Sequence, residues 1–342
     1  MTGLCDTWDM KSIMKFVLGI VVVGMLLAGA WLAYGSLFAA PQAEPTSDVF
    51  IINRNQDGSV IADKLQSQGF VRSGFAFASI LSAKGKLSAI APGGYHLSKD
   101  MDVWQVAEKL ITGNPDLKWV TIPEGWRKEQ IGELLAKTFN WSGDDLKKWD
   151  TVYTKMRSEY LEGTYFPDTY LIPIDESGLD MANRMTRRFD EQFAPYVGGF
   201  AAQNIQWTTG LKLASLIQRE AAGNGDMPLI AGILWNRLNR GMKLEIDATV
   251  QYARGKADAG WWAPITSDDI KIIDSPYNTY EYKGLPPTPI DSPGLAAIDA
   301  TLHPAETDCL YYLHDANRQI HCAVTYEDHL ANIETYLRHP QK

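Results

Sequence analysis

The sequence predicts an α+β protein with one N-terminal transmembrane helix, a small α+β module and a larger α+β domain. Three observations support this prediction. One apolar stretch near the N-terminus is long enough to cross a membrane, short strand and helix signals alternate between residues 49 and 138, and residues 141–204 are mainly helical with an aromatic interruption. With 342 residues, the chain can form two domains and a sizeable core.

The apolar stretch begins at Phe16, carries no charge through Tyr34 and stays apolar through Phe38. A secretory signal peptide is the alternative interpretation. Its apolar core is normally shorter, and Phe38-Ala39-Ala40 places a large residue where a cleavage site needs a small one. We therefore expect a retained transmembrane helix over residues 16–38, after a tail of residues 1–15.

The distribution of basic residues predicts the orientation of this helix. Lys11 and Lys15 precede it, and the first basic residue after it is Arg54. By the positive-inside rule, the short tail is cytoplasmic and the body of the chain is exported. In a bacterium this describes a single-pass protein of the inner (cytoplasmic) membrane with a periplasmic or extracytoplasmic body, joined to the helix by a linker at residues 39–48.

Composition excludes several classes of partner and cofactor. The formal net charge is −9 and no basic run interleaves with aromatics, so we expect no nucleic-acid partner. The sequence has no CxxC pair, no HExxH and no clustered His and Asp residues, so no metal site is predicted. No GxGxxG or GxxxxGK[ST] motif is present, so we expect no cofactor.

The predicted topology places Cys5 on the reducing side and the other two cysteines in an oxidising compartment. Residues 309–313 and 318–324 have the pattern of two strands around a turn at 314–317. This register puts Cys309 opposite Cys322 and predicts a disulfide. The alternative is two small apolar strand residues.

Between residues 49 and 138, a strand-turn-helix unit recurs about three times with little sequence identity. Its strands are predicted at 49–52, 94–97 and 119–122, and its helices at 60–65, 75–81, 103–111 and 128–138. Such small units resemble the LysM-like modules that bind cell-wall glycans. We therefore predict a LysM-like module at residues 49–118, with a plain spacer as the alternative.

Glu220 is the strongest candidate for chemistry. It ends an amphipathic helix and shares one face with three apolar residues, Leu213, Leu216 and Ile217. Burying an anion at the end of an apolar stripe is costly, so the pKa of Glu220 should rise, as a general acid requires. The alternative is an ordinary surface charge, solvated or paired with Arg219 or Lys212.

Polar side chains after this helix are candidates for ligand contacts. Asn236 lies in a predicted helix that Asp226 caps and Gly241 ends. Asp247 and Thr249 follow a predicted strand at 243–246, where sites are often built. Surface exposure is the alternative for Asn236, and turn formation or helix capping is the alternative for the other two.

Two loops combine polar and aromatic residues. Asn278 and Thr279 stand between Tyr277 and Tyr280, which suits a sugar-contacting surface. Residues 162–170 form a second aromatic cluster, in which Asp168 can orient a neighbour or cap the turn. Structural packing is the alternative for both loops.

A series of short motifs runs in one order along the chain: Pro123-Glu124-Gly125, Glu162-Gly163, Phe166-Pro167-Asp168-Thr169-Tyr170, Glu220 in IQREAA, Asn236-Arg237-Leu238, Asp247-Ala248-Thr249-Val250-Gln251-Tyr252, Tyr277-Asn278-Thr279-Tyr280, Gly284-Leu285-Pro286-Pro287 and His303-Pro304. This series resembles the endolytic murein transglycosylases, the MltG or YceG-like family. Each motif alone is weak, but the ordered series covers almost the whole chain. The resemblance makes residues 119–342 a YceG-like catalytic domain.

The sequence departs from the family pattern at three positions. Ala248 stands where the family often has Pro, and Cys322 stands where an aromatic residue is usual. Gln218 stands where many members carry Glu, which leaves Glu220 as the only carboxylate at this helix end.

The resemblance implies cleavage of peptidoglycan glycan strands between N-acetylmuramic acid and N-acetylglucosamine, leaving a 1,6-anhydromuramoyl end. Glu220 would act as acid and then as base, without a second catalytic carboxylate. The implied cleft residues are Asp247, Thr249, Asn278, Thr279, Tyr280 and Asn236. Cell-wall synthesis machinery is an expected partner.

Two other functions fit the same residues. In a muramidase, Asp247 or Asp168 would supply a second carboxylate and water would attack the sugar. In a non-catalytic wall-binding anchor, Glu220 would have no chemical role.

Overall fold

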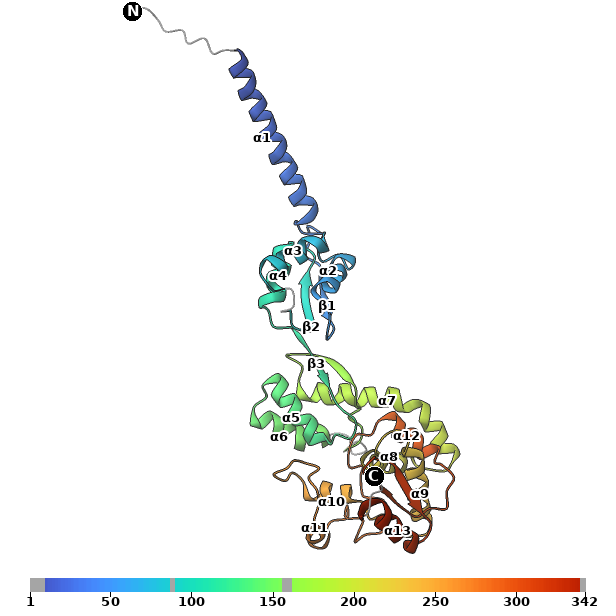
Figure 1. Ribbon diagram of the computed structural model, residues 1–342. Helices are drawn as coiled ribbons and strands as arrows, with labels where there is room; N and C mark the ends of the chain where they lie inside the picture. Colours follow the sequence, from blue (N-terminus) through green and yellow to red (C-terminus); the bar gives the residue numbers. More distant parts are fainter. Residues whose placement is uncertain (1–9, 87–89, 156–161, 339–342) are drawn as a thin grey trace, which may run out of the picture. The chain divides into compact units, whose positions relative to one another are not determined.

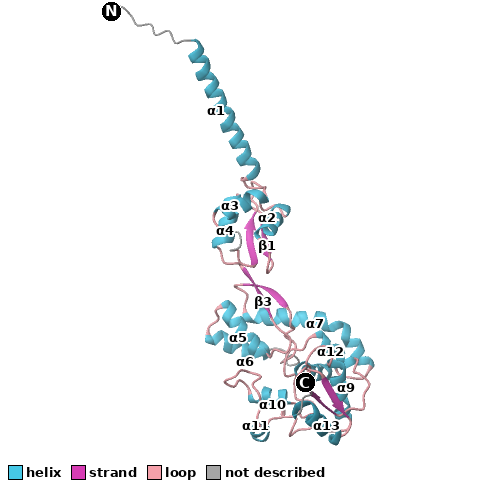
Figure 2. Ribbon diagram, viewed as in Figure 1, coloured by secondary structure: helices cyan, strands magenta, loops and turns pink. Residues whose placement is uncertain are grey.

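The structure is a computed structural model that describes residues 10–86, 90–155 and 162–338 (Figure 1). Cys5 lies outside these residues. The mixture of helices and strands confirms the predicted α+β class (Figure 2). The chain divides into two compact units. We call Met1–Trp119 with Leu171–Ile174 the N-terminal unit, and Val120–Tyr170 with Asp175–Lys342 the C-terminal unit.

The first element is the apolar helix α1, Met10–Leu37. Its segment Met14–Leu37 is long and apolar enough to cross a membrane, and none of it is buried against the rest of the protein. At 1.5 Å per residue, its 24 residues extend about 36 Å, more than the ~30 Å hydrocarbon core of a bilayer. This confirms the predicted N-terminal apolar helix.

The N-terminal unit packs three helices against a short antiparallel sheet. Strand β1, Ser47–Ile52, pairs with β2, Gly93–Ser98, from Ser47↔Ser98 to Ile52↔Gly93. The helices are α2, Gly58–Ser67; α3, Gly74–Ala83; and α4, Val103–Thr112. The alternation of the strands sends Phe50, Tyr95 and Leu97 into the core, where each is fully buried.

The chain leaves the N-terminal unit within one strand, returns to it within a second, and leaves it again just after the second strand ends. The two strands are β3, Leu117–Thr121, and β4, Thr169–Pro173, and the sheet has the order β1-β2-β3-β4. The predicted strand at 119–122 is therefore confirmed, although it begins two residues earlier and ends one residue earlier.

The C-terminal unit is mainly helical. Helix α8, Trp207–Glu220, contacts α7, Gly178–Ala202; α9, Met227–Asn239; α10, Asp247–Arg254; and α12, Leu295–Leu302. The remaining elements are α5, Lys128–Phe139; α6, Gly143–Thr151; the 3₁₀ turn η1, Tyr153–Lys155; α11, Ser267–Ile272; β5, Tyr311–His314; β6, Ile320–Ala323; α13, Tyr326–Ile333; and the π-helical turn η2, Glu334–Arg338. The surrounding helices place α8 in the core of this unit.

The predicted strand at 243–246 is wrong, because residues 242–246 form an irregular segment that leads directly into α10. Glu245 adopts a left-handed backbone conformation with φ of 54°, which a strand does not accommodate. The guanidinium of Arg237 also donates hydrogen bonds to the carbonyl oxygens of Lys243 and Leu244, at 3.3 and 2.7 Å. These carbonyls are therefore not available for a sheet partner.

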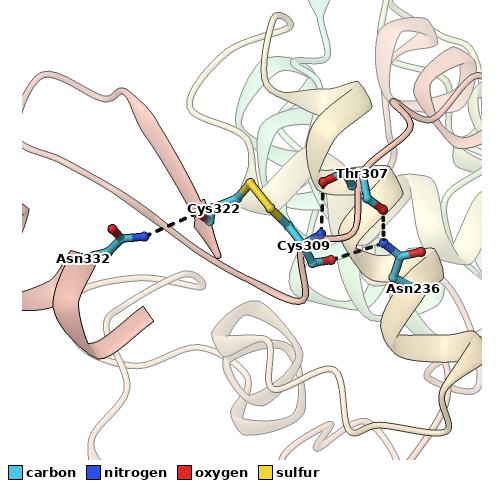
Figure 3. Close-up of a disulfide and its surroundings, with 5 residues drawn as sticks. All are labelled: Asn236, Thr307, Cys309, Cys322 and Asn332. Carbon is cyan, nitrogen blue, oxygen red and sulfur yellow. Dashed lines mark hydrogen bonds between the residues drawn. A yellow bond between two sulfur atoms is a disulfide. The ribbon is translucent and has the colours of Figure 1, made fainter. Parts of the chain in front are cut away.

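Cys309 and Cys322 form the predicted disulfide, with 5.9 Å between their Cα atoms (Figure 3). The predicted register of the hairpin is wrong, because Cys322 pairs with Tyr312 and Cys309 precedes β5. The connection is longer than a four-residue turn, since an Oδ1 atom of Asp315 accepts from the amides of Asn317 and Gln319 at 2.8 and 2.9 Å. With this Asx-type turn, Cys322 pairs with a residue three positions later in the chain than predicted.

Candidate active site

Glu220 is the last residue of α8, and its carboxyl group meets the β5–β6 hairpin. The apolar face of α8 is fully buried at Leu213, Leu216 and Ile217, so the helix is fixed in the core. Glu220 itself is half-buried. The hydroxyl of Tyr312 in β5 donates to its Oε2 atom at 2.7 Å. This contact joins two residues that are far apart in the sequence.

The surroundings of Glu220 favour its protonated form. Burial raises the pKa of Glu220 above its ordinary value, and the nearby charge of Asp247 raises it further. The hydrogen bond from Tyr312 and the charges of His314 and Arg219 lower it, without cancelling the effect of burial. The rise expected from the apolar stripe in the sequence is therefore confirmed.

Glu220 lines a pocket of about 250 Å³. This volume is below the ~300–1,000 Å³ of typical drug-sized ligand sites, so the pocket suits one end of a ligand rather than an entire chain. Tyrosine rings form much of its wall. The other lining residues are Arg237, Leu244, Glu245, Tyr280, Tyr311, Tyr312, Tyr326 and His329.

Arg237 in α9 fixes one side of this pocket. Its Nε atom donates to the carbonyl of Leu310 at 2.6 Å, and its Nη1 atom donates to the carbonyl of Leu244 at 2.7 Å and to Glu245 at 3.2 Å. The guanidinium also lies over the ring of Tyr311, 5.1 Å from its centroid. One buried cation thus ties α9, the irregular segment and the hairpin together.

Tyr280 and Asp247 lie beside Glu220 as a bonded pair. The hydroxyl of Tyr280 donates to Oδ1 of Asp247 at 2.6 Å, and Tyr280 lines the pocket. Asp247 is exposed at the start of α10, and its charge acts on Glu220. The structure therefore brings these two predicted site residues together with the candidate acid.

Thr249, Thr279 and Asn278 are buried behind the pocket wall. The two threonine hydroxyls lie 2.9 Å apart, and Thr279 Oγ1 also accepts from the amide of Ile246 at 3.0 Å. Asn278 donates to two backbone carbonyls of α11 and its C-terminal cap, and its Oδ1 accepts from the amide of Tyr280 at 3.1 Å. Their polar atoms thus bond within the protein and hold the Tyr280 loop against the start of α10.

Asn236 lies at a different hollow. Its Nδ2 atom donates to the carbonyls of Thr307 and Cys309, at 2.6 and 3.2 Å (Figure 3). It lines a space of about 530 Å³ with Trp235 and Thr307 among its walls, and it is not among the residues that line the Glu220 pocket. The structure does not bring Asn236 together with Glu220.

Three further carboxyl groups were singled out by the motifs or by their burial. Asp168 forms an ion pair with Arg188 at 2.7 Å. Glu162 is buried and accepts from the amide of Lys128 at 2.9 Å and from the hydroxyl of Tyr252 at 3.1 Å; burial raises its pKa to about 8. Burial also raises the pKa of Asp291 well above its usual range. None of the three lines the Glu220 pocket.

No sequence pattern pointed to Tyr312, Tyr311 or His314, and Arg237 appeared only as part of a motif. Residues two apart in a strand point to the same face, so the Tyr312 and His314 spacing could have indicated a shared surface. His314 Nε2 lies 3.1 Å from the carboxylate of Asp226, which follows α8 in the chain. No local pattern shows that this face meets Glu220.

Comparison with known proteins gives consistent matches. The model of the YceG-like family matches residues 50–335. A Bacillus subtilis protein named endolytic murein transglycosylase is 31% identical over 336 residues, which cover 92% of this chain and 91% of that protein. A Streptococcus pneumoniae protein of the same name is 28% identical over 367 residues, which cover 96% of this chain but 66% of that protein.

The fold also matches a solved structure. The crystal structure of a yceG-like protein from Listeria monocytogenes aligns with a TM-score of 0.60 and 27% identity. The alignment covers 83% of this chain and 98% of that one. The likeness therefore extends over most of the chain.

Proposed function

The chain belongs to the YceG-like family, and we propose that it is a membrane-anchored endolytic murein transglycosylase with Glu220 as its catalytic residue. Its substrate is the glycan strand of peptidoglycan, cut between N-acetylmuramic acid and N-acetylglucosamine. The observation that carries the proposal is the position of Glu220, a carboxyl group with a raised pKa in the wall of a tyrosine-lined pocket.

The reaction uses Glu220 twice. The protonated carboxyl group donates its proton to the glycosidic oxygen as the C1–O bond of the muramic acid breaks through an oxocarbenium-like state. The resulting carboxylate then accepts the proton of the C6 hydroxyl, whose oxygen attacks C1 of the same sugar. The product ends in a 1,6-anhydro ring, Glu220 is again protonated and no water is consumed.

Tyr312 gives the two carboxyl oxygens different roles. Its hydroxyl donates to Oε2, so the proton of the acid resides on Oε1. When Glu220 becomes a carboxylate, the same hydrogen bond becomes charge-assisted and stronger. Tyr312 therefore stabilises the anionic stage of the cycle. Because the attacking hydroxyl is tethered to the substrate, the reaction needs no second carboxylate to activate a water molecule.

We assign different roles to the other predicted site residues. Tyr280 and Asp247 contact the substrate at the pocket. Thr249, Asn278 and Thr279 position Tyr280 through their buried hydrogen bonds. Asn236 supports the chain segment before the disulfide.

The proposed organisation follows the predicted boundaries. Residues 1–15 form a cytoplasmic tail, residues 16–38 cross the inner membrane, and residues 39–48 join the helix to a LysM-like module at 49–118. Residues 119–342 form the periplasmic catalytic domain, and cell-wall synthesis machinery is its expected partner. The module adds a second contact with glycan.

Product analysis of Glu220→Gln tests the function. The full chain in detergent micelles should release glycan fragments with anhydro ends from purified peptidoglycan, and Glu220→Gln should reduce the rate by at least about a hundredfold, because it removes the acid. Mass spectrometry distinguishes anhydro ends from reducing ends. The matched control is Glu281→Gln, which neutralises an exposed carboxylate that is not among the residues lining the pocket.

Each competing function predicts a different result. Fragments that carry added water would establish the muramidase, for which the charge of Asp247 near Glu220 is the supporting observation. Equal release by the wild type and Glu220→Gln would remove Glu220 from the chemistry. No release by either, with retained binding to peptidoglycan, would indicate the wall-binding anchor.

A further inference from the structure

The end of α1 is bonded directly to the N-terminal unit. Arg72 donates from Nη1 to the carbonyl of Gly35 at 2.7 Å and from Nε to the carbonyl of Ala40 at 2.8 Å. The amide of Val103 donates to the carbonyl of Phe38 at 3.1 Å. The last turn of the apolar helix and the residues that follow are therefore held against this unit.

These bonds bring the N-terminal ends of two other helices to the same place. Arg72 immediately precedes Ser73, the N-cap of α3, and Val103 is the first residue of α4. Each of these helices exposes a large ring in its first turn. Phe75 is 80% exposed and Trp104 is 47% exposed.

An aromatic series links Trp104 to α1. Tyr34 near the end of α1 stacks on Phe38 with 6.0 Å between ring centroids, and Phe38 stacks on Trp104 with 6.1 Å. Trp31, one turn before Tyr34, is also exposed. Aromatic residues concentrate where a membrane meets water, because their rings prefer the layer of lipid headgroups.

The outer face of α3 carries no charge. Its exposed positions after Phe75 include Ser79 and Ser82, spaced at i+4 and i+7, and the whole helix Gly74–Ala83 lacks a charged side chain. The Ser79 hydroxyl donates to the carbonyl of Phe75 at 2.8 Å, so it is bonded without water. An uncharged face is unusual in a chain of net charge −9, and it avoids repulsion by anionic lipids.

We propose that this surface, formed by Phe38, Phe75, Trp104 and the outer face of α3, lies in the headgroup layer of the membrane that α1 crosses. The occupant is the lipid bilayer itself. The headgroup layer lies at the end of α1, where the helix leaves the bilayer. The hydrogen bonds of Arg72 and Val103 hold the surface at the same depth. The N-terminal unit is thus a second membrane contact rather than a freely tethered module. The inference depends on α1 crossing the membrane and not on the proposed reaction.

The same unit offers a matched control at its other end. The α1 junction lies at the Ser47 end of β1, because the amide of Gln42 donates to the carbonyl of Lys99 at 3.1 Å and the neighbouring Ser98 pairs with Ser47. Helix α2 begins after the opposite end of β1, about 17 Å away at 3.4 Å per residue. Val60 in its first turn is 47% exposed, the same fraction as Trp104. It should therefore lie in water.

Site-specific fluorescence quenching tests the proposal. In a Cys5→Ser background, the disulfide-bonded cysteines leave an introduced cysteine as the reactive thiol. Phe75→Cys, Val60→Cys and Gly24→Cys are each labelled with an environment-sensitive fluorophore. The full chain is then reconstituted in phosphatidylethanolamine–phosphatidylglycerol vesicles that contain nitroxide-labelled lipids. A Cβ at Gly24 meets no neighbouring atom within 4 Å, so this substitution is tolerated.

We expect the label at position 75 to shift its emission to the blue and to lose intensity with headgroup nitroxides. The label at position 60 should show neither change, and that at position 24 should be quenched by nitroxides on the acyl chains. Equal behaviour at 75 and 60 would overturn the proposal. So would a label at 75 that is shielded from aqueous iodide but unaffected by lipid nitroxides, because a second copy or another protein would then cover the surface.

The label at position 24 tests independently whether α1 crosses the bilayer. If position 24 is quenched and position 75 is not, the surface proposal fails while the transmembrane helix and the proposed reaction stand. If position 24 is not quenched, α1 does not cross the bilayer and the surface proposal fails with it. Release of anhydro fragments by the same sample reports independently on the reaction.

Discussion

Tyr312 determines which oxygen of Glu220 carries the catalytic proton in the proposed reaction. The sequence indicated Glu220, because its position at the end of an apolar stripe is a local pattern. It did not indicate Tyr312, because the hydrogen bond between them depends on how the hairpin packs on the end of α8. The same holds for Arg237, whose partners are mostly backbone carbonyls and leave no pattern of side chains.

Removing the Tyr312 hydroxyl should alter both the rate and its pH dependence. Hydrogen bonds to charged groups contribute about 1.5–3 kcal/mol, so Tyr312→Phe should reduce the maximal rate roughly tenfold or more. The bond lowers the pKa of Glu220, so its loss should raise that pKa. Because the reaction begins with protonated Glu220, the fall in kcat/KM on the alkaline side should move to higher pH. Rates of glycan release across pH measure both effects.

Tyr326→Phe is the matched control for this prediction. Tyr326 lines the same pocket in α13, but the hydroxyl that donates to Glu220 is that of Tyr312. We expect its pH profile to follow the wild type. An unshifted profile in Tyr312→Phe would show that the hydrogen bond does not govern the titration of Glu220.

At the scale of elements, sequence patterns predicted helices better than they predicted registers. The helices over 103–111 and 128–138 follow from start signals and periodicity in the sequence, and the structure contains both. The strand at 243–246 and the hairpin register failed for tertiary and turn-specific reasons. At residues 243–246, Arg237 occupies backbone carbonyls that a strand partner would need. In the hairpin, the turn around Asp315 lengthens the connection between the strands.

The disulfide should stabilise the hairpin that carries Tyr312. Cys309 and Cys322 are 13 residues apart, and closing a loop of similar length stabilises a protein by about 3 kcal/mol in the chain-entropy account. Replacing both by serine should therefore lower the melting temperature. It should also lower the rate of glycan release, because Cys322 is the strand partner of Tyr312. Thermal unfolding in micelles and product release measure these effects.

Cys5→Ser is the control, since this thiol lies outside the hairpin and the predicted topology places it in the cytoplasm. It should melt like the wild type. A double variant with unchanged stability and rate would mean that the hairpin keeps its geometry without the bridge.

For the whole molecule, buried carboxyl groups make stability depend on pH. Glu162 has a pKa of about 8 when folded, against an ordinary value of 4.5. Below the ordinary value, both states are protonated and Glu162 carries no penalty. As pH rises toward 8, the unfolded chain ionises more readily than the folded one, so the free energy of unfolding falls. Asp291 acts in the same direction.

Glu162→Gln should weaken this dependence, because the amide stays neutral at every pH. We expect the variant to lose less stability than the wild type between about pH 4.5 and 8, with part of the slope remaining from Asp291. Melting temperatures across this range provide the measurement, and Glu281→Gln should follow the wild type. A steeper slope in Glu162→Gln would contradict the buried, protonated state.

The return of the chain to the N-terminal unit in β4 has a consequence for biogenesis. Leu171–Ile174 belong to the N-terminal unit, although they follow Trp119 by some fifty residues. If the residues after α1 are exported in chain order while the tail stays in the cytoplasm, as in the predicted orientation, β4 emerges after α5 and α6. The sheet that begins with β1 therefore stays incomplete until the first helices of the C-terminal unit have crossed the membrane, and the two units mature together rather than one after the other.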